Sequence, residues 1–245
     1  MKKKYLFIPL VLVIATNMSI AHEVNTNSFI ELRSGFSLNS GKESASNKSP
    51  LNSKADFNNS YIVGMSMGFK PSCDWKIALS IDYAPKWTLT HQAEYRNGMK
   101  TFYRSNVSTT SATIDIVYDI NKLSYNKITP YVMTGVGLAV NNISDTDFFV
   151  DNIAILKFYE QSTTNLAWKI GAGVNYDITD KIYMNLGYTY ANLGKIGSNI
   201  AKSYPNSDPG YENPSYHQTL QPNLVYNKYK KLTSHRFMIG IGFKL

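Results

Sequence analysis

Six charged residues stand on the small or polar side of stretches in which apolar residues alternate with small or polar ones. In each stretch the charge alternates with apolar residues at a period of two, which on a β-strand places the two kinds of side chain on opposite faces. The six residues are Glu31, Arg33, Asp82, Asp115, Lys169 and Arg236. An isolated charge in a narrow protein interior is costly, so charges placed there must pair. We therefore predict an internal network of ion pairs, with an ion path gated by the same charges as the alternative.

The four histidines offer neither a catalytic nor a metal-binding arrangement. They are His22, His91, His217 and His235, and no two of them stand at the spacing of zinc ligands. The segment Ser215–Thr219 contains both Ser and His, but it has neither the strand pattern nor the companion Asn that a lipid A deacylase needs. We expect no enzymatic activity, no catalytic residue, no cofactor and no bound metal.

A second group of residues is suited to binding, and it lies in the longest polar segment of the chain. Tyrosines there stand among Asn, Ser and Lys, and aromatic side chains beside adaptable polar ones make good contact surfaces. The candidates are Tyr211, Tyr216, Tyr226, Lys228, Lys230 and Lys231. The lysines also suit sulfated glycans or acidic protein patches. The alternative is that the segment is a solvated loop without a ligand.

Eight stretches of the chain show the strict alternation of apolar with small or polar residues that is typical of a β-strand with one apolar face. They span residues 30–38, 61–69, 75–83, 112–120, 129–140, 166–178, 182–190 and 237–245. The face opposite the apolar one is rich in glycine, which would relieve crowding inside a barrel of eight strands, because such a barrel is only just wide enough for side chains.

The connections between these stretches alternate between short and long. The short ones are 71–74, 121–127 and 179–181, and the long polar ones are about 39–60, 86–106, 141–163 and 193–233. A soluble β-sandwich gives no reason for this alternation, whereas outer-membrane barrels have tight periplasmic turns and long extracellular loops. The sequence therefore predicts an all-β fold, an eight-stranded antiparallel up-and-down transmembrane β-barrel whose four long loops face outside.

The N-terminus has the pattern of an export signal. Three lysines precede an apolar run and a small-residue cleavage site, so we expect a signal peptide over 1–21 and the barrel over 22–245. The single cysteine, Cys73, cannot form an internal disulfide. Without Lys2, Lys3 and Lys4 the net charge falls from +8 to about +5, and this excess is spread along the chain and forms no basic face, which argues against a nucleic-acid partner.

Three stretches resemble the opacity-protein and OmpA-like eight-stranded outer-membrane barrels, a group that includes small surface antigens and adhesins of intracellular alphaproteobacteria. The first is Thr129–Val132 with Gly135–Gly137, the second is Ala167–Val174 with Tyr176–Thr179, and the third is Ile182–Tyr188. The resemblance implies a place in the outer membrane and often binding to host cells or matrix. It identifies no binding residue, because the loops of the family vary.

These observations favour a surface adhesin or antigen that binds a host-cell or extracellular-matrix protein through its loops. The alternative is a structural or small-pore barrel. We expect a monomer whose other partners are outer-membrane lipids and lipopolysaccharide.

Overall fold

The computed structural model describes residues 27–39, 52–94, 100–150, 153–196, 201–203 and 230–245. The expected signal peptide, 1–21, lies outside the described residues. So do four of the candidate binding residues, which are Tyr211, Tyr216, Tyr226 and Lys228.

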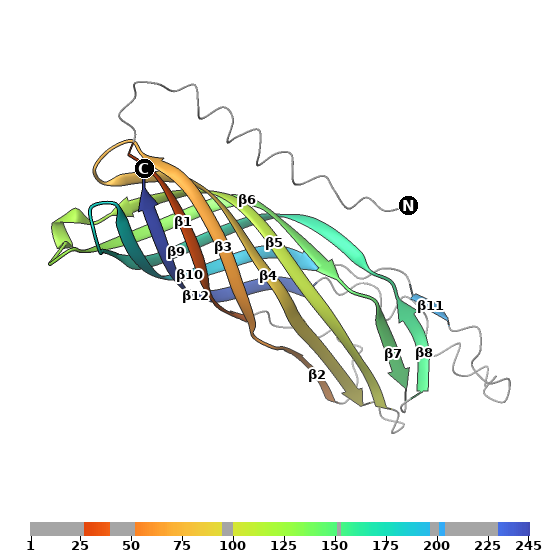
Figure 1. Cartoon of the computed structure of the whole chain (residues 1–245). Coiled ribbons are helices and arrows are strands. Elements are labelled where there is room, and N and C mark those ends of the chain that lie inside the picture. The colour runs from red at the N-terminus through yellow and green to blue at the C-terminus, as the bar shows by residue number, and fades with distance from the viewer. Residues whose placement is uncertain (1–26, 40–51, 95–99, 151–152, 197–200, 204–229) are drawn as a thin grey trace, which may run out of the picture.

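Eight long strands form a closed antiparallel barrel (Figure 1). They are β1 (Asn27–Asn39), β3 (Ser60–Lys70), β4 (Trp75–Glu94), β5 (Lys100–Asp119), β6 (Ile128–Ile143), β9 (Gln161–Asp177), β10 (Ile182–Ile196) and β12 (Lys230–Lys244). Each pairs with its neighbours in this order, and β12 pairs with both β10 and β1, which closes the ring. The predicted barrel is confirmed, and each predicted stretch falls on one of these strands with at most its last residue beyond the strand's end.

Apolar side chains cover the outside of the barrel. On the neighbouring strands β10 and β12, Leu186 is 58% and Ile239 52% exposed, whereas Met238 points inward and is only 5% exposed. Exposed aromatic residues stand toward both ends of the apolar surface. Near the short turns they are Phe69, Trp75, Tyr176 and Phe243, and toward the other end they are Tyr61, Tyr83, Trp168 and Tyr188. An apolar band between two aromatic girdles is the outer surface that a barrel presents to lipid.

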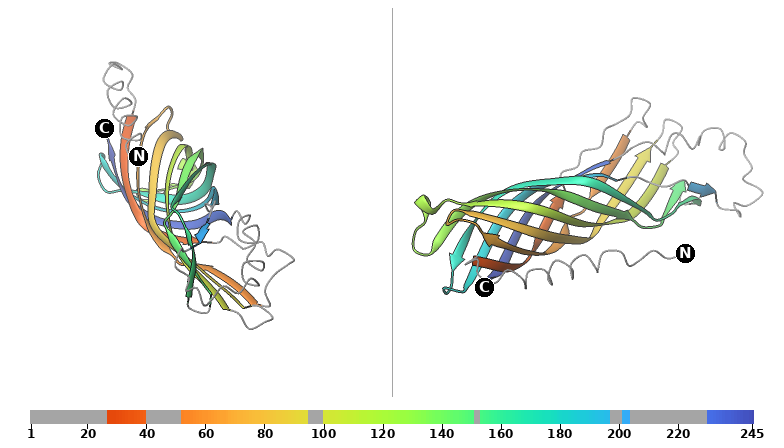
Figure 2. Two further views of the ribbon diagram at one scale, coloured as in Figure 1. Left: turned by 90° about the vertical axis from the view of Figure 1, so that its right-hand side faces the viewer. Right: turned by 90° about the horizontal axis from the view of Figure 1, so that it is seen from above.

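Short turns connect the strands at one end of the barrel, the end that also holds the C-terminus (Figures 1 and 2). The connection between β5 and β6 contains a short 3₁₀ helix, η2 (Asn121–Leu123), and then a tight hairpin. In that hairpin Tyr125 and Ile128 exchange backbone hydrogen bonds of 3.0 and 2.9 Å, and Asn126 and Lys127 have φ angles of 45° and 70°. Positive φ at both central residues matches the twist of the flanking strands. Among the described residues, no helix is long and apolar enough to cross a membrane.

At the opposite end, four further strands extend the sheet beyond the barrel (Figure 2). They are β2 (Asn52–Phe57), β7 (Thr146–Val150), β8 (Ile153–Phe158) and β11 (Ala201–Ser203). Together with the far ends of β4 and β5 they form a sheet in the order β11-β8-β7-β5-β4-β2, which we call the projecting sheet.

The projecting sheet occupies parts of all four segments that the sequence predicts to be loops. The segment 86–106 is mostly the continuation of β4 and β5, and 39–60 contains β2. Lys230 and Lys231, predicted to be loop residues, begin β12 opposite Ile196 and Lys195. These segments do not show the strict alternation that predicts the eight barrel strands, so the sequence predicts loops there.

Candidate functional site: a filled lumen and a projecting sheet

The six predicted charges come together inside the barrel, with Asp82 at the centre. Arg33 Nη2 donates a hydrogen bond of 3.0 Å to Asp82 Oδ1. On the other side, Asp82 Oδ2 lies 3.2 Å from Arg236 Nη1 and 3.4 Å from Lys169 Nζ. The side chains of Asp82 and Arg236 are 1% and 2% exposed. One buried carboxylate therefore pairs with cations from three different strands.

The other two acids complete this network. Lys169 Nζ lies 2.8 Å from Asp115 Oδ2, and the hydroxyl groups of Ser80 and Thr113 also donate to the Asp115 carboxylate. Glu31 Oε1 lies 3.7 Å from Arg33 Nη1. Three cationic and three acidic side chains are thus held together, so the formal charge of the network is zero. A balanced and hydrogen-bonded set of this kind avoids the cost of an unpaired buried charge.

Glycine makes room for two of the carboxylates. A Cβ atom at Gly64 would meet Asp82 Oδ1, and a Cβ atom at Gly135 would meet Asp115 Oδ1. Gly64 stands opposite Asp82 in the pairing of β3 with β4, and Gly135 stands opposite Asp115 in the pairing of β5 with β6. The glycines thus let each acid fold back across the neighbouring strand into the network.

A second group of charges, which the sequence did not single out, lies nearer the turns. Asp119 accepts both Lys76 Nζ at 2.9 Å and Lys70 Nζ at 3.3 Å. At the mouth itself, Lys244 Nζ lies 2.7 Å from Asp177 Oδ1, and both side chains are partly exposed. All five residues stand on the inward face in the same alternation that identified the first network. The alternation in the sequence could therefore have identified these five charges as inward-facing, although it could not have shown which of them form ion pairs.

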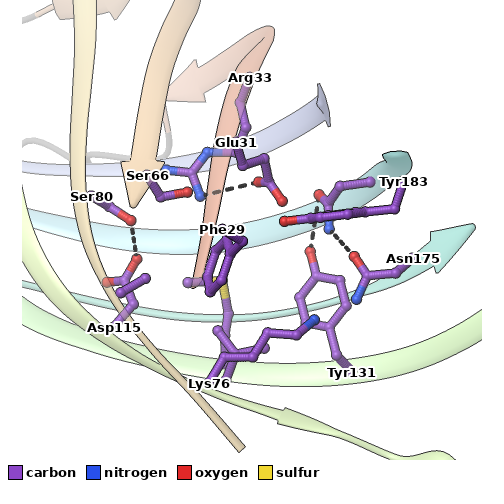
Figure 3. A pocket seen from close by; sticks show the side chains of 14 residues that line it. Phe29, Glu31, Arg33, Ser66, Lys76, Ser80, Asp115, Tyr131, Asn175 and Tyr183 are labelled. Carbon is purple, nitrogen blue, oxygen red and sulfur yellow. Dashed lines mark hydrogen bonds and ion pairs between the residues drawn. The ribbon is translucent and has the colours of Figure 1, made fainter. Parts of the chain in front are cut away.

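Between the two charged groups lies a polar layer around a small cavity (Figure 3). Tyr131 donates its hydroxyl hydrogen to Asn185 Oδ1 at 3.2 Å, and Asn185 Nδ2 donates to Asn175 Oδ1 at 2.8 Å. The cavity among these side chains, Tyr183 and Glu31 measures about 30 Å³. That volume holds one or two water molecules and no larger solute.

Toward the projecting sheet the lumen is apolar instead. Trp87, Val107 and Leu232 are each 0% exposed and belong to one buried cluster with residues from β6, β9 and β10. Asn141 crosses this layer: its Oδ1 accepts from Thr109 Oγ1 at 2.9 Å and its Nδ2 donates to the carbonyl oxygen of Leu193 at 2.8 Å. A cavity of about 270 Å³ opens at the turn-side mouth, beside Lys70, Asp119 and Lys244. Beyond it the described lumen is filled at successive levels by a polar layer, ion pairs and an apolar layer.

The projecting sheet is joined to the barrel by continuous strands and by side-chain contacts. Ser105 and Thr146 share a hydrogen bond of 2.7 Å between β5 and β7, and the rings of Phe102 and Phe149 lie 6.4 Å apart. At the base of the β7–β8 hairpin, Asp145 Oδ1 accepts the backbone N–H of Glu160 at 2.6 Å. The sheet is therefore a structured extension of β4 and β5.

The described part of the chain contains no group of three or more His, Cys, Asp or Glu residues placed to hold a metal ion. His91 lies in β4 and not in a loop, and His235 lies in β12, where its Nδ1 shares a hydrogen bond of 2.6 Å with the hydroxyl of Tyr188. Cys73 is a free cysteine exposed in the turn between β3 and β4. The main features of the described structure are thus a closed barrel and the projecting sheet at one of its ends.

Comparison with known proteins agrees with this architecture. Outer membrane protein PagN of Salmonella typhimurium is 29% identical over 140 residues, which are 57% of this chain and 51% of PagN. The chain thus matches about half the length of that relative. The crystal structure of Neisserial surface protein A covers 91% of this chain and 100% of its own, with a TM-score of 0.51 and 12% sequence identity, which shows a shared fold.

Residues 75–227, more than half of the chain, match one protein family, the outer membrane protein beta-barrel domain. The matched region includes β4, β5, β6, β9 and β10. Of these strands, β4 supplies Asp82, β5 supplies Asp115 and β9 supplies Lys169. The chain therefore belongs to the outer membrane protein β-barrel domain family and is a protein of the cell outer membrane.

Proposed function

We propose that this protein is a surface adhesin whose barrel is a scaffold and whose projecting sheet and adjoining loops bind a host-cell or extracellular-matrix protein. The observation that carries the proposal is the pairing of a filled lumen with a structured sheet at one end only. The proposal assigns the protein no catalytic role, no cofactor and no metal, and it treats the barrel as a monomer surrounded by outer-membrane lipid and lipopolysaccharide.

The filled lumen argues that the barrel does not act by passing solutes. An ion that entered from the turns would meet the Asp119 group, then the neutral network around Asp82, and then the apolar layer around Trp87. The Asp119 group borders a cavity of about 270 Å³ at the turn-side mouth, whereas the network around Asp82 and the layer around Trp87 are both buried and lie across the lumen. Opening a path would break several buried ion pairs, and breaking one buried pair typically costs about 3–5 kcal/mol.

The projecting sheet supports the binding role. Barrels of this class have short periplasmic turns and longer extracellular loops, so we place the projecting sheet outside the cell and the short turns in the periplasm. The strand order ends at β2 on one side and β11 on the other. The connection from β11 to β12 holds Tyr211, Tyr216, Tyr226 and Lys228, and it leaves and re-enters the described structure at this end of the barrel.

The pairing of β4 with β5 allows a sharp test. Thr88 stands opposite Asn106, so replacing residues 89–105 with Asn-Gly would close the hairpin just above the barrel with a favoured two-residue turn. This variant loses the partner strand of both β2 and β7. We expect it to reach the outer membrane and to remain heat-modifiable on gels, while cells that carry it lose binding to host-cell monolayers and to immobilised matrix proteins.

A matched control changes a turn at the other end. Lys127→Gly keeps the left-handed backbone of the hairpin at Asn126 and Lys127, so this variant should bind as the parent does. If the shortened variant still binds host cells at the level of the control, the projecting sheet is not the binding element.

The second candidate function is a small pore, favoured only by the presence of charges in the lumen. Planar-bilayer recordings distinguish the two. The adhesin proposal expects no regular conductance steps from the folded protein, whereas steps that disappear in Arg236→Ala would support the pore.

A further inference from the structure

The outer surface of the barrel carries an unusual group of side chains toward the projecting sheet. Five residues from three adjacent strands point outward there and touch one another. They are Trp168, Tyr188, Tyr190, His235 and Phe237, which we call the aromatic–histidine cluster. Such residues differ from the aliphatic side chains that follow them toward the turns, such as Ile239 and Ile241.

The geometry of the cluster fixes the imidazole ring. Tyr188 stacks on His235 with ring centres 5.9 Å apart, and Tyr190 meets the same ring edge-on at 5.3 Å. The Tyr188 hydroxyl and His235 Nδ1 share a hydrogen bond of 2.6 Å. Because Nδ1 is engaged in this bond, a ligand at the edge of the apolar band would meet the ring at Nε2.

A groove lies directly next to the cluster, on the side of the turns. It measures about 510 Å³ and its lining is almost wholly apolar. Small residues form its floor, with Ser34 and Ala172 among them, and Leu186, Tyr188, Phe237 and Ile239 border it. Tyr188 and Phe237 therefore belong to both the groove and the cluster, so a single elongated molecule would touch both.

The occupant that fits this combination is a lipid. A groove on the membrane-facing surface is exposed to acyl chains, and a histidine held by tyrosines at the polar edge can donate a hydrogen bond to a phosphate oxygen. Lys195, exposed at the end of β10 nearest the projecting sheet, places a cationic residue beyond the cluster on the same strand as Tyr188 and Tyr190.

We propose that the groove and the aromatic–histidine cluster bind one molecule of lipid A, the phosphorylated lipid of the outer leaflet, with an acyl chain in the groove and a phosphate at His235 Nε2. The choice of this lipid rests on the orientation proposed above, in which the projecting sheet lies outside the cell. Binding would involve no covalent step and no residue of the lumen.

The test measures lipid retained by the purified full-length chain in phosphatidylcholine nanodiscs that contain a small fraction of either lipid A or phosphatidylglycerol, by native mass spectrometry. We expect retention of lipid A over both phospholipids. His235→Ala should weaken retention about tenfold, the effect of losing a hydrogen bond to a charged group. Tyr188→Phe should also weaken retention, because it removes the hydrogen bond that orients the imidazole ring. Tyr83→Phe is the control, because Tyr83 is also an outward aromatic residue, 43% exposed, but belongs to β4 and lies outside the cluster.

Ala172→Leu provides an independent variant, since it fills the groove from the lipid side and leaves the histidine in place. It should also reduce retention of lipid A. Unchanged retention in both His235→Ala and Ala172→Leu would overturn the proposal, and so would equal retention of phosphatidylglycerol and lipid A. The assay contains no host ligand, so a negative result for lipid A is independent of the result for host-cell binding.

Discussion

Removing the central carboxylate by Asp82→Asn should destabilise the barrel by about 3–5 kcal/mol, the cost of leaving a buried charge without its partner. The substitution changes little in size and removes one negative charge from a network with three charges of each sign. Arg33 keeps Glu31 at 3.7 Å and Lys169 keeps Asp115 at 2.8 Å. Within the described residues, Arg236 keeps only the Ser234 hydroxyl, which accepts from Nε at 3.1 Å.

The uncompensated charge in Asp82→Asn is therefore mainly that of Arg236, which predicts a rescue. Arg236→Met in the same chain restores charge balance, so the double variant should be more stable than Asp82→Asn alone. Urea unfolding of the barrel in detergent micelles, followed by gel mobility and tryptophan fluorescence, gives the free energies.

Asp177→Asn is the control for this experiment, because the Asp177 side chain is 43% exposed and an exposed ion pair contributes about 0–1 kcal/mol. The reasoning fails if Asp82→Asn costs no more than Asp177→Asn, or if the costs of Asp82→Asn and Arg236→Met simply add.

Three further predictions address the membrane face, the lumen and the orientation. Ile239→Arg should cost about 2–4 kcal/mol in lipid vesicles, because the side chain lies in the apolar band; a wild-type unfolding midpoint would contradict this. Gly242→Val should cost about 1–3 kcal/mol by overpacking, since a Cβ atom there meets the Tyr183 ring, and Tyr183→Ala in the same chain should recover part of the loss in the same measurement. Trypsin added to intact cells should cut within 228–231 and spare Lys127; cleavage at Lys127 alone would reverse the proposed orientation.

The eight barrel strands could be predicted from sequence because lipid imposes a simple rule. Every second residue on a spanning strand must be apolar, while a lumen of eight strands requires its neighbours to be small or able to pair. The stretch 182–190 illustrates the rule: Leu186 is 58% exposed on the outside, and the alternate residues Tyr183 and Asn185 are both 5% exposed inside. Whether a side chain points inward or outward on such a regular strand thus depends only on whether its position is odd or even.

The apolar layer of the lumen could not be predicted, because the pairing is irregular there. Ala84 and Trp87 are three residues apart and both are buried, since the register of β4 with β5 shifts between them. A second shift lies between Asn192 and Lys195 on β10, beside Gly194 with its φ of +81°. A bulge places an extra residue in one strand and exchanges the faces of all the residues beyond it. Strict alternation therefore stops being informative at these positions.

The partners of the inward charges also lie beyond sequence reasoning. Parity assigns Arg33, Asp82 and Arg236 to the same interior, but Arg33 and Asp82 are 49 positions apart and Arg236 and Asp82 are 154 apart. Which of them meet depends on the register of β1 with both β3 and β12, and so on closure of the barrel. A shift of one residue would exchange the faces of the strand, so register and charge pairing are specified together.

The arrangement separates what stabilises the protein from what we propose it binds with. The ion pairs and the apolar layer lie inside the barrel, on strands whose pairing is complete without the projecting sheet. The sheet depends on the barrel through β4 and β5, which pass without interruption from one to the other, as the pairings from Trp75 opposite Tyr118 to Glu94 opposite Lys100 show. Changes beyond Thr88 and Asn106 therefore alter the exposed end without removing any residue of the ionic network. A barrel built in this way should fold even when the end that we propose binds is changed extensively, because the ionic network and the apolar layer lie outside that end.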